Sequence, residues 1–173
     1  MKTVYSFLLL ALVSYSQISY SQHCRFEFNK TDSMSGQKRI KTEEQSIAIT
    51  NVAGIYFSLE NTTATYLDVR YTVASTTPIT IGFSNKLTLS LLNDEVIELP
   101  LADVIRAETG AANNLTINPK YKITIEQIEK INSIGIKKIR LNTSQYYFDF
   151  DVKRKGWLKK FKEDSDCFIK EIK

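Results

Sequence analysis

The sequence predicts a mainly β fold of the α+β class: an antiparallel β-sandwich or curled sheet, with one short helix and a C-terminal helix packed on it. Three observations predict it. Apolar and polar residues alternate in many short segments, which is the pattern of strands with one buried face. Turn-forming residues separate most of these segments. The spacing of apolar residues changes to that of an amphipathic helix at residue 124 and again at residue 157.

The N-terminal segment has the features of an export signal. Lys2 precedes an uncharged apolar run, residues 4–13, which is about half as long as a bilayer-spanning helix. Ser19 and Ser21 are small residues at the two positions that a signal peptidase reads before its cut. We therefore expect residues 1–21 to be a cleaved signal peptide.

Residues 22–173 are expected to form a single β-rich domain that is secreted or periplasmic. No other apolar segment approaches membrane-spanning length, so we expect no membrane span. The net charge of +4 is far from the dense positive charge of a nucleic-acid binder. Export is a second argument against nucleic acid as a partner.

The two cysteines, Cys24 and Cys167, lie near the two ends of this region. An exported chain meets an oxidising compartment, in which an even number of cysteines usually pairs. We therefore expect a disulfide between them, and the chain-entropy model gives so long a loop a stabilisation of roughly 5 kcal/mol. The alternative is two thiols that are buried separately, and a catalytic thiol is disfavoured because it would have to be kept reduced.

The first strand is predicted to begin at Cys24, with Cys24, Phe26 and Phe28 pointing inward. A turn follows at residues 31–37, in which Gly36 is free to adopt a positive φ. The later strands are expected at residues 38–42, at 55–59 and 67–73 as a hairpin across Asn61-Thr62-Thr63, at 79–83, at 87–91 and 97–99 as a hairpin across Asn93-Asp94, and at 115–117 within the loop 107–119.

A short helix is predicted to begin after Thr124 and to end before Gly135. The side chains of Thr124 and Gln127 fit a capping box, and a stripe of isoleucines follows at helical spacing. Two further strands are then expected at residues 136–141 and 146–152.

The C-terminal segment is predicted to be an amphipathic helix docked on the sheet. Its apolar stripe consists of Trp157, Leu158, Phe161, Ser165, Phe168, Ile169 and Ile172. Asp164 and Asp166 are poorly placed for the helix dipole, so we expect solvated side chains there and fraying or a break in the helix near them.

Residues that carry enzymatic chemistry are scarce. His23 is the only histidine and follows closely on the expected cut, so catalytic pairs that need an oriented histidine and zinc sites are not expected. The glycines form no phosphate-binding motif and no nucleophile elbow. We therefore expect no metal, no cofactor and no enzymatic activity.

Asp149 and Asp151 share one face of a predicted strand, roughly 6 to 7 Å apart. A small hydrolase could use such a carboxylate pair as acid and base, provided that both lie in a concave pocket and at least one has a raised pKa. Cross-strand charge pairing with the strand that carries Lys138 and Arg140 is the interpretation we favour.

Tyr56, Tyr66 and Tyr147 all occupy the polar face of their predicted strands. Aromatic rings on an exposed sheet can bind a glycan or another envelope or extracellular protein, although tyrosine is also a common strand residue half-buried under loops. We therefore expect an exported, non-catalytic binding or interaction domain that acts through these three rings. The small carboxylate-dependent hydrolase and a structural envelope protein are the alternatives.

Six short features lie along the chain: the Ser-x-Ser cut before Gln22, the aromatic strand from Cys24, the polar turn from Asp32 to Gly36, the helix followed by IKKIRL, the strand YYFDFDV, and the final Cys-x-Ile. Together they resemble small exported proteins of unknown function from Bacteroidota. The resemblance implies export and a β-rich domain, and it carries no catalytic residues. Asp32-Ser33-Met34 is also similar to the short O-glycosylation acceptor pattern of that group.

Overall fold

The computed structural model describes residues 24–74, 79–103, 105–106, 114–153 and 156–173. The expected signal peptide, His23 and part of the predicted loop 107–119 lie outside these residues. The described chain is mainly β, its sheets are antiparallel, and a short helix and a C-terminal helix pack beside them. The predicted fold class is therefore confirmed.

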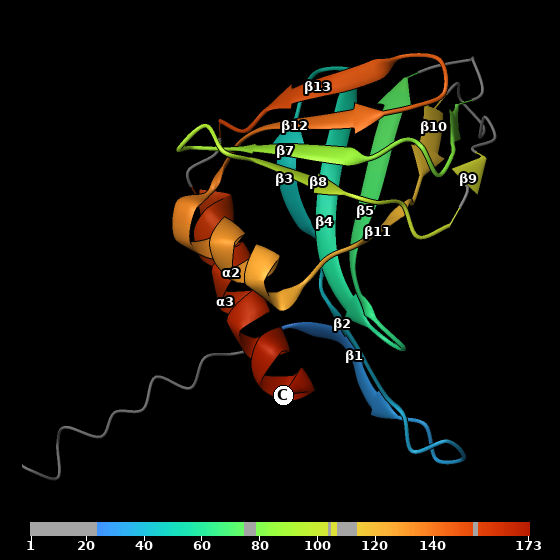
Figure 1. The fold of residues 1–173 in the computed structure, drawn as a ribbon, viewed down its shortest axis with the longest axis vertical. Helices are drawn as coiled ribbons and strands as arrows, with labels where there is room; N and C mark the ends of the chain where they lie inside the picture. The colour runs from blue at the N-terminus through green and yellow to red at the C-terminus, as the bar shows by residue number, and fades with distance from the viewer. Residues whose placement is uncertain (1–23, 75–78, 104, 107–113, 154–155) are drawn as a thin grey trace, which may run out of the picture.

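Two sheets make up most of the fold (Figure 1). The larger has seven strands in the order β1-β2-β4-β5-β10, and β3 and β11 pair with β4 and β5 respectively. These strands are β1 (Phe26–Thr31), β2 (Lys38–Thr42), β3 (Gln45–Ile49), β4 (Ala53–Asn61), β5 (Thr65–Ala74), β10 (Asn114–Ile117) and β11 (Lys120–Lys122). The second sheet has four strands in the order β13-β12-β7-β8: β7 (Leu87–Leu91), β8 (Val96–Leu99), β12 (Ile136–Asn142) and β13 (Tyr147–Asp151). The short strands β6 (Thr80–Ile81) and β9 (Ile105–Arg106) pair with each other.

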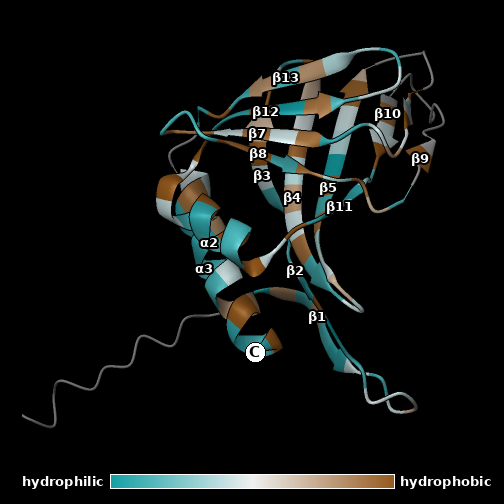
Figure 2. Ribbon diagram, in the orientation of Figure 1, coloured by the Kyte–Doolittle hydropathy of each residue, from teal (hydrophilic) through white to brown (hydrophobic). Residues whose placement is uncertain are grey.

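The four-stranded sheet packs in front of the seven-stranded sheet in the view of Figure 1, and its strands run across β4 and β5 rather than along them. Figure 2 shows hydrophobic and hydrophilic residues alternating along most strands, so each sheet has an apolar inner face. Aromatic contacts join the two inner faces. The ring of Tyr71 on β5 lies 4.8 Å from that of Phe148 and 5.7 Å from that of Phe150, both on β13, as measured between ring centroids.

Both helices lie beside the sheets and contact each other (Figure 1). Helix α2 (Ile125–Ile134) has the predicted capping box: the Thr124 hydroxyl accepts from the Gln127 amide, and the Gln127 side chain accepts from the Thr124 amide. Helix α3 (Gly156–Ile172) packs on β2, β3 and β4. Its apolar stripe belongs to the same buried cluster as the inner faces of the sheets.

Both predicted hairpins are present. Strands β4 and β5 pair continuously from Ala53↔Val73 to Asn61↔Thr65. Strands β7 and β8 are joined by a turn in which Asp94 has a φ of +65°, a left-handed conformation that aspartate tolerates. The turn before β2 is also as expected, because Gly36 has a φ of +68°.

Three local expectations are wrong. The first strand does not turn Cys24 and Phe28 inward: Cys24 is exposed, and Phe28 is half-buried beside Arg39 because the register shifts between Phe26 and Phe28. Phe83 is exposed beyond the end of the short strand β6. Helix α3 runs unbroken past Asp164, which is buried instead of solvated. Asp164 is buried because Arg25, just before β1, and Gln45 on β3 bind it, and the helix sequence alone does not reveal these partners.

Candidate binding surfaces

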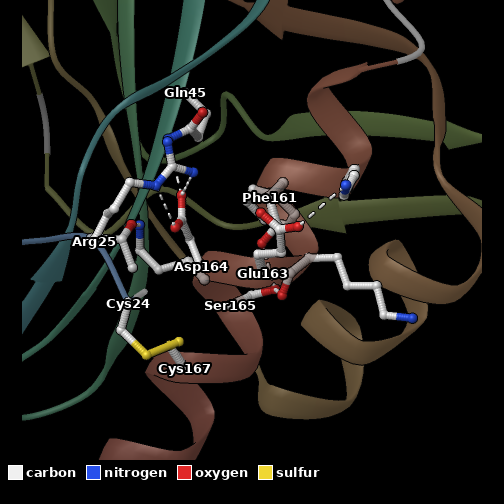
Figure 3. A network of polar contacts seen from close by, with 12 residues as sticks. Cys24, Arg25, Gln45, Phe161, Glu163, Asp164, Ser165 and Cys167 are labelled. Carbon is white, nitrogen blue, oxygen red and sulfur yellow. Dashed lines mark hydrogen bonds and ion pairs between the residues drawn. A yellow bond between two sulfur atoms is a disulfide. The ribbon is translucent and has the colours of Figure 1, made fainter. Parts of the chain in front are cut away.

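The disulfide between Cys24 and Cys167 is formed, as predicted (Figure 3). It joins Cys24, two residues before β1, to the last part of α3, across 143 positions of sequence. The exposed Cys24 is bonded to Cys167, which is a buried residue of α3. The bond therefore fastens the start of the described chain to its C-terminal helix.

Asp164 lies near this bond and binds both β3 and the segment that precedes β1 (Figure 3). Arg25 donates to it from Nε over 3.3 Å and from Nη2 over 3.0 Å, and Gln45 Nε2 donates to Oδ2 over 2.9 Å. The carboxylate side chain is only 4% exposed. Burial raises the pKa of Asp164, and the guanidinium of Arg25 opposes that shift. Asp164 therefore links α3 to β3 and to the segment that precedes β1.

The three tyrosines do not form one surface. Tyr56 on β4 and Tyr66 on β5 lie on the outer face of the seven-stranded sheet, whereas Tyr147 on β13 lies on the outer face of the four-stranded sheet. Tyr66 pairs with Glu60, four residues along β4 from Tyr56, so the first two are roughly 13 Å apart along the strands. The structure therefore separates the predicted binding residues onto two faces.

Tyr56 is held flat against its own sheet. A side-chain carbon at Gly54 would meet the Tyr56 ring at 3.0 Å, so the ring covers the place that a larger residue would fill. The guanidinium of Arg70 lies 3.9 Å from the centroid of this ring and is itself bonded to Glu44. The ring, half-buried, lines a pocket of about 310 Å³ beside the exposed Val52. These contacts give Tyr56 a structural role in packing the outer face of its own sheet.

Tyr147 is the most exposed of the three tyrosines, with 58% of its surface accessible. Its cross-strand neighbour lines a pocket of about 390 Å³ on the outer face of the four-stranded sheet, whose lining residues are Thr88, Ser90, Glu98, Lys138, Arg140 and Asn142. The cross-strand register places Tyr147 opposite Asn142, and the Arg140 guanidinium lies 4.1 Å from the ring centroid. We call these seven residues, with Lys86, Asp149 and Asp151, the polar face.

Every charged group of the polar face has a partner of opposite sign. Arg140 donates to both carboxylate oxygens of Asp149 over 2.7 and 2.8 Å, and its hydrogen bond holds the pKa of Asp149 below the ordinary value. Lys138 lies within 4 Å of Asp149 and Asp151. The third pair is Lys86–Glu98, at 2.6 Å. Cations and carboxylates balance, so the polar face is close to neutral.

These contacts bear directly on the hydrolase alternative. The predicted cross-strand charge pairing of Asp149 and Asp151 is confirmed. Both aspartates are exposed and the pKa of Asp149 is lowered, so this pair does not meet the requirement for a raised pKa within a concave site.

Two neighbouring carboxyl groups with shifted pKa values, Glu60 and Asp68, lie elsewhere, on the outer face of the seven-stranded sheet. Burial raises the pKa of Asp68 to about 6, and the charge of the neighbouring Glu60 adds to the shift while Lys120 opposes it. Burial also favours a higher pKa for Glu60, but a hydrogen bond from Lys120 outweighs this effect and holds the pKa below the usual value. Lys41 completes the cluster, 3.6 Å from Asp68.

The sequence analysis missed this cluster although its signal was present. Glu60 and Asp68 both occupy polar positions of the predicted hairpin. Asp68 pairs with Ser58, two residues from Glu60, so the register makes the two carboxylates diagonal neighbours.

The protein was compared with family models, curated proteins and solved structures, and none of the three comparisons finds a match. Among the described residues, no helix is both long enough and apolar enough to cross a membrane. The same part of the chain contains no group of three histidine, cysteine or acidic side chains placed to hold a metal ion.

Proposed function

We propose that this protein is an exported, non-catalytic binding domain that recognises a neutral glycan on its polar face. The proposal is carried by one observation: the exposed ring of Tyr147 lies beside Asn142 and Arg140, which belong to a pocket whose lining residues are all polar and whose charges are paired. Figure 1 shows this sheet facing the viewer with neither α2 nor α3 in front of it.

The chemistry of such a pocket suits a polyhydroxylated ligand. A sugar ring offers apolar C–H groups that pack on an aromatic ring, and hydroxyls that both donate and accept hydrogen bonds. The hydroxyls of Thr88 and Ser90 and the amide of Asn142 also donate and accept. Because the charges are neutralised in pairs, a neutral ligand adds hydrogen bonds without breaking an ion pair.

Two features support export. The Cys24–Cys167 disulfide is typical of proteins that fold outside the reducing cytoplasm. The N-terminal sequence predicts a cleaved signal peptide, and processing by a signal peptidase is testable by mass spectrometry of the protein recovered from a producing cell.

The test of the binding proposal is a screen of the full protein against an array of neutral oligosaccharides, followed by titration calorimetry on any hit. Tyr147→Ala is expected to weaken binding at least about tenfold, since it removes the exposed aromatic ring on which a sugar would pack. Tyr66→Ala is the matched control, because it makes the same change on the other sheet and should leave affinity unchanged. Equal losses in both variants, or binding only to a protein partner, would contradict a glycan site on the polar face.

A further inference from the structure

The hairpin of β1 and β2 extends beyond the rest of the seven-stranded sheet (Figure 1). One side of it is tied to α3, because Lys38 Nζ bonds the backbone oxygen of Glu171 at 3.0 Å and also its carboxylate, and Asn29 Nδ2 donates to that carboxylate over 3.2 Å. Its turn is fixed by Asp32, whose Oδ1 accepts from the amides of Met34 and Ser35. The hairpin is therefore held in place by α3 and by the hydrogen bonds of its own turn.

The opposite side of the hairpin carries a pocket of about 450 Å³, within the size range of small-molecule sites. It is lined by Phe28, Lys30, Thr31, Asp32, Ser33 and Arg39, which we call the hairpin pocket. Lys30 and Arg39 are directly opposite each other in the cross-strand register. The guanidinium of Arg39 lies 5.9 Å from the centroid of the Phe28 ring, which helps to orient it beside Lys30.

Lys30 and Arg39 differ from most cations of the sheets in having no ion-pair partner within the described part of the chain. Lys38, Lys41, Arg70, Lys86, Lys120, Lys138 and Arg140 all lie within 4 Å of a carboxylate. Two like charges placed opposite each other on neighbouring strands repel, and Asp32 attracts Arg39 without forming an ion pair with it, so the repulsion is only partly offset when no ligand is bound. An anion between them would remove that repulsion.

Asp32 supplies the one negative charge of the pocket. Hydrogen bonds from the Ser35 backbone and hydroxyl and from the Met34 backbone lower the pKa of Asp32, so it is ionised at neutral pH. Two cations and one carboxylate leave the pocket with a net charge of +1. This balance favours a ligand group with a single negative charge over a phosphate monoester, which carries nearly two.

We propose that the hairpin pocket binds a monoanionic oxyanion group, a sulfate ester or a carboxylate, carried on a sugar-sized ligand. The planar fork of Arg39 can donate two parallel hydrogen bonds to such a group, and Lys30 adds a third from the neighbouring strand. This site is independent of the polar face, because it lies on the other sheet and uses charge where the polar face uses neutral hydrogen bonding.

Four sugars that differ only at one carbon test the proposal by titration calorimetry: glucose 6-sulfate, glucuronate, glucose 6-phosphate and glucose. Binding of the sulfate or the carboxylate with little or none of glucose supports it, and the two arms show which group is preferred. Affinity should fall as sodium chloride is raised, since the contacts are ionic and exposed. Equal binding of glucose, tighter binding of the phosphate, or no binding of any of the four would overturn it.

Single substitutions distinguish binding in this pocket from nonspecific binding of an anion to positive charge elsewhere on the surface. Lys30→Ala and Arg39→Gln are each expected to weaken binding of the preferred anion about fivefold or more. Lys122→Ala removes another exposed lysine that has no ion pair among the described residues, and it should change nothing. Tyr147→Ala should also leave this affinity unchanged, so failure here and failure of the polar-face proposal are distinguishable. Unchanged thermal melting of each variant establishes that the fold is retained, and equal losses in Lys122→Ala would refute the pocket.

Discussion

Removing the disulfide is expected to be the most damaging small change to this fold. The double variant Cys24→Ser/Cys167→Ala opens a loop of 143 positions, and the chain-entropy relation gives a loss of about 5 kcal/mol at 25 °C. Alanine at position 167 avoids placing an unpaired hydroxyl at this buried site. The ion pair of Arg25 with Asp164 stays in place, so the expected loss is that of the covalent bond alone.

The assay is guanidinium denaturation of the wild type, the variant, and the wild type with dithiothreitol. A loss of about 5 kcal/mol would lower the midpoint by roughly 1 M and the melting temperature by about 10 to 20 °C. Reduction of the wild type should reproduce the variant. The reasoning would be refuted if both changes cost less than about 1 kcal/mol, because the packing of α3 would then suffice to fix the two ends of the described chain.

Two further predictions concern buried carboxylates. Asp68 titrates near pH 6 when folded but near 3.8 when unfolded, so the unfolded state loses this proton first and stability falls as pH rises from about 4 to 6. Asp68→Asn should remove up to about 3 kcal/mol of that decline in the free energy of unfolding. Urea denaturation at pH 4 and at pH 7 measures this, and the same difference in stability between wild type and variant at both pH values would contradict it. Asp164→Ala leaves Arg25 and Gln45 without their shared acceptor and should cost about 2 kcal/mol or more by chemical denaturation, whereas Asp166→Ala, as its control, should cost much less.

The elements that were predictable from sequence are those whose pattern is complete within a few residues. The hairpin of β4 and β5 alternates strictly, and the Thr124 capping box is a local arrangement of two side chains. Strand β3 was missed because Ile47 and Ala48 are both buried and the register shifts between Ser46 and Ala48, which breaks the alternation. Strand β11 is only three residues long and has no pattern to detect.

The sites were less predictable because they depend on contacts between distant segments. The helix dipole argues against Asp164 within α3, but its partner Arg25 is 139 positions away in sequence. Alternation correctly placed Tyr56 on an outer face, yet it could not show that the ring covers Gly54 and lies under Arg70. Side chains at equivalent strand positions therefore have different roles, which are set by their neighbours across the sheet.

Ion pairing provides a physical basis for distinguishing the two proposed surfaces. On the polar face, Arg140 is already committed to Asp149 through two hydrogen bonds, so a charged ligand would have to break a favourable pair before it gained a new one. Neutral hydroxyls avoid that cost. In the hairpin pocket, Lys30 and Arg39 have no pair to break, and an anion relieves their mutual repulsion. The same types of side chain thus favour opposite classes of ligand on the two surfaces, and the difference lies in whether each cation already has a carboxylate within ion-pair distance.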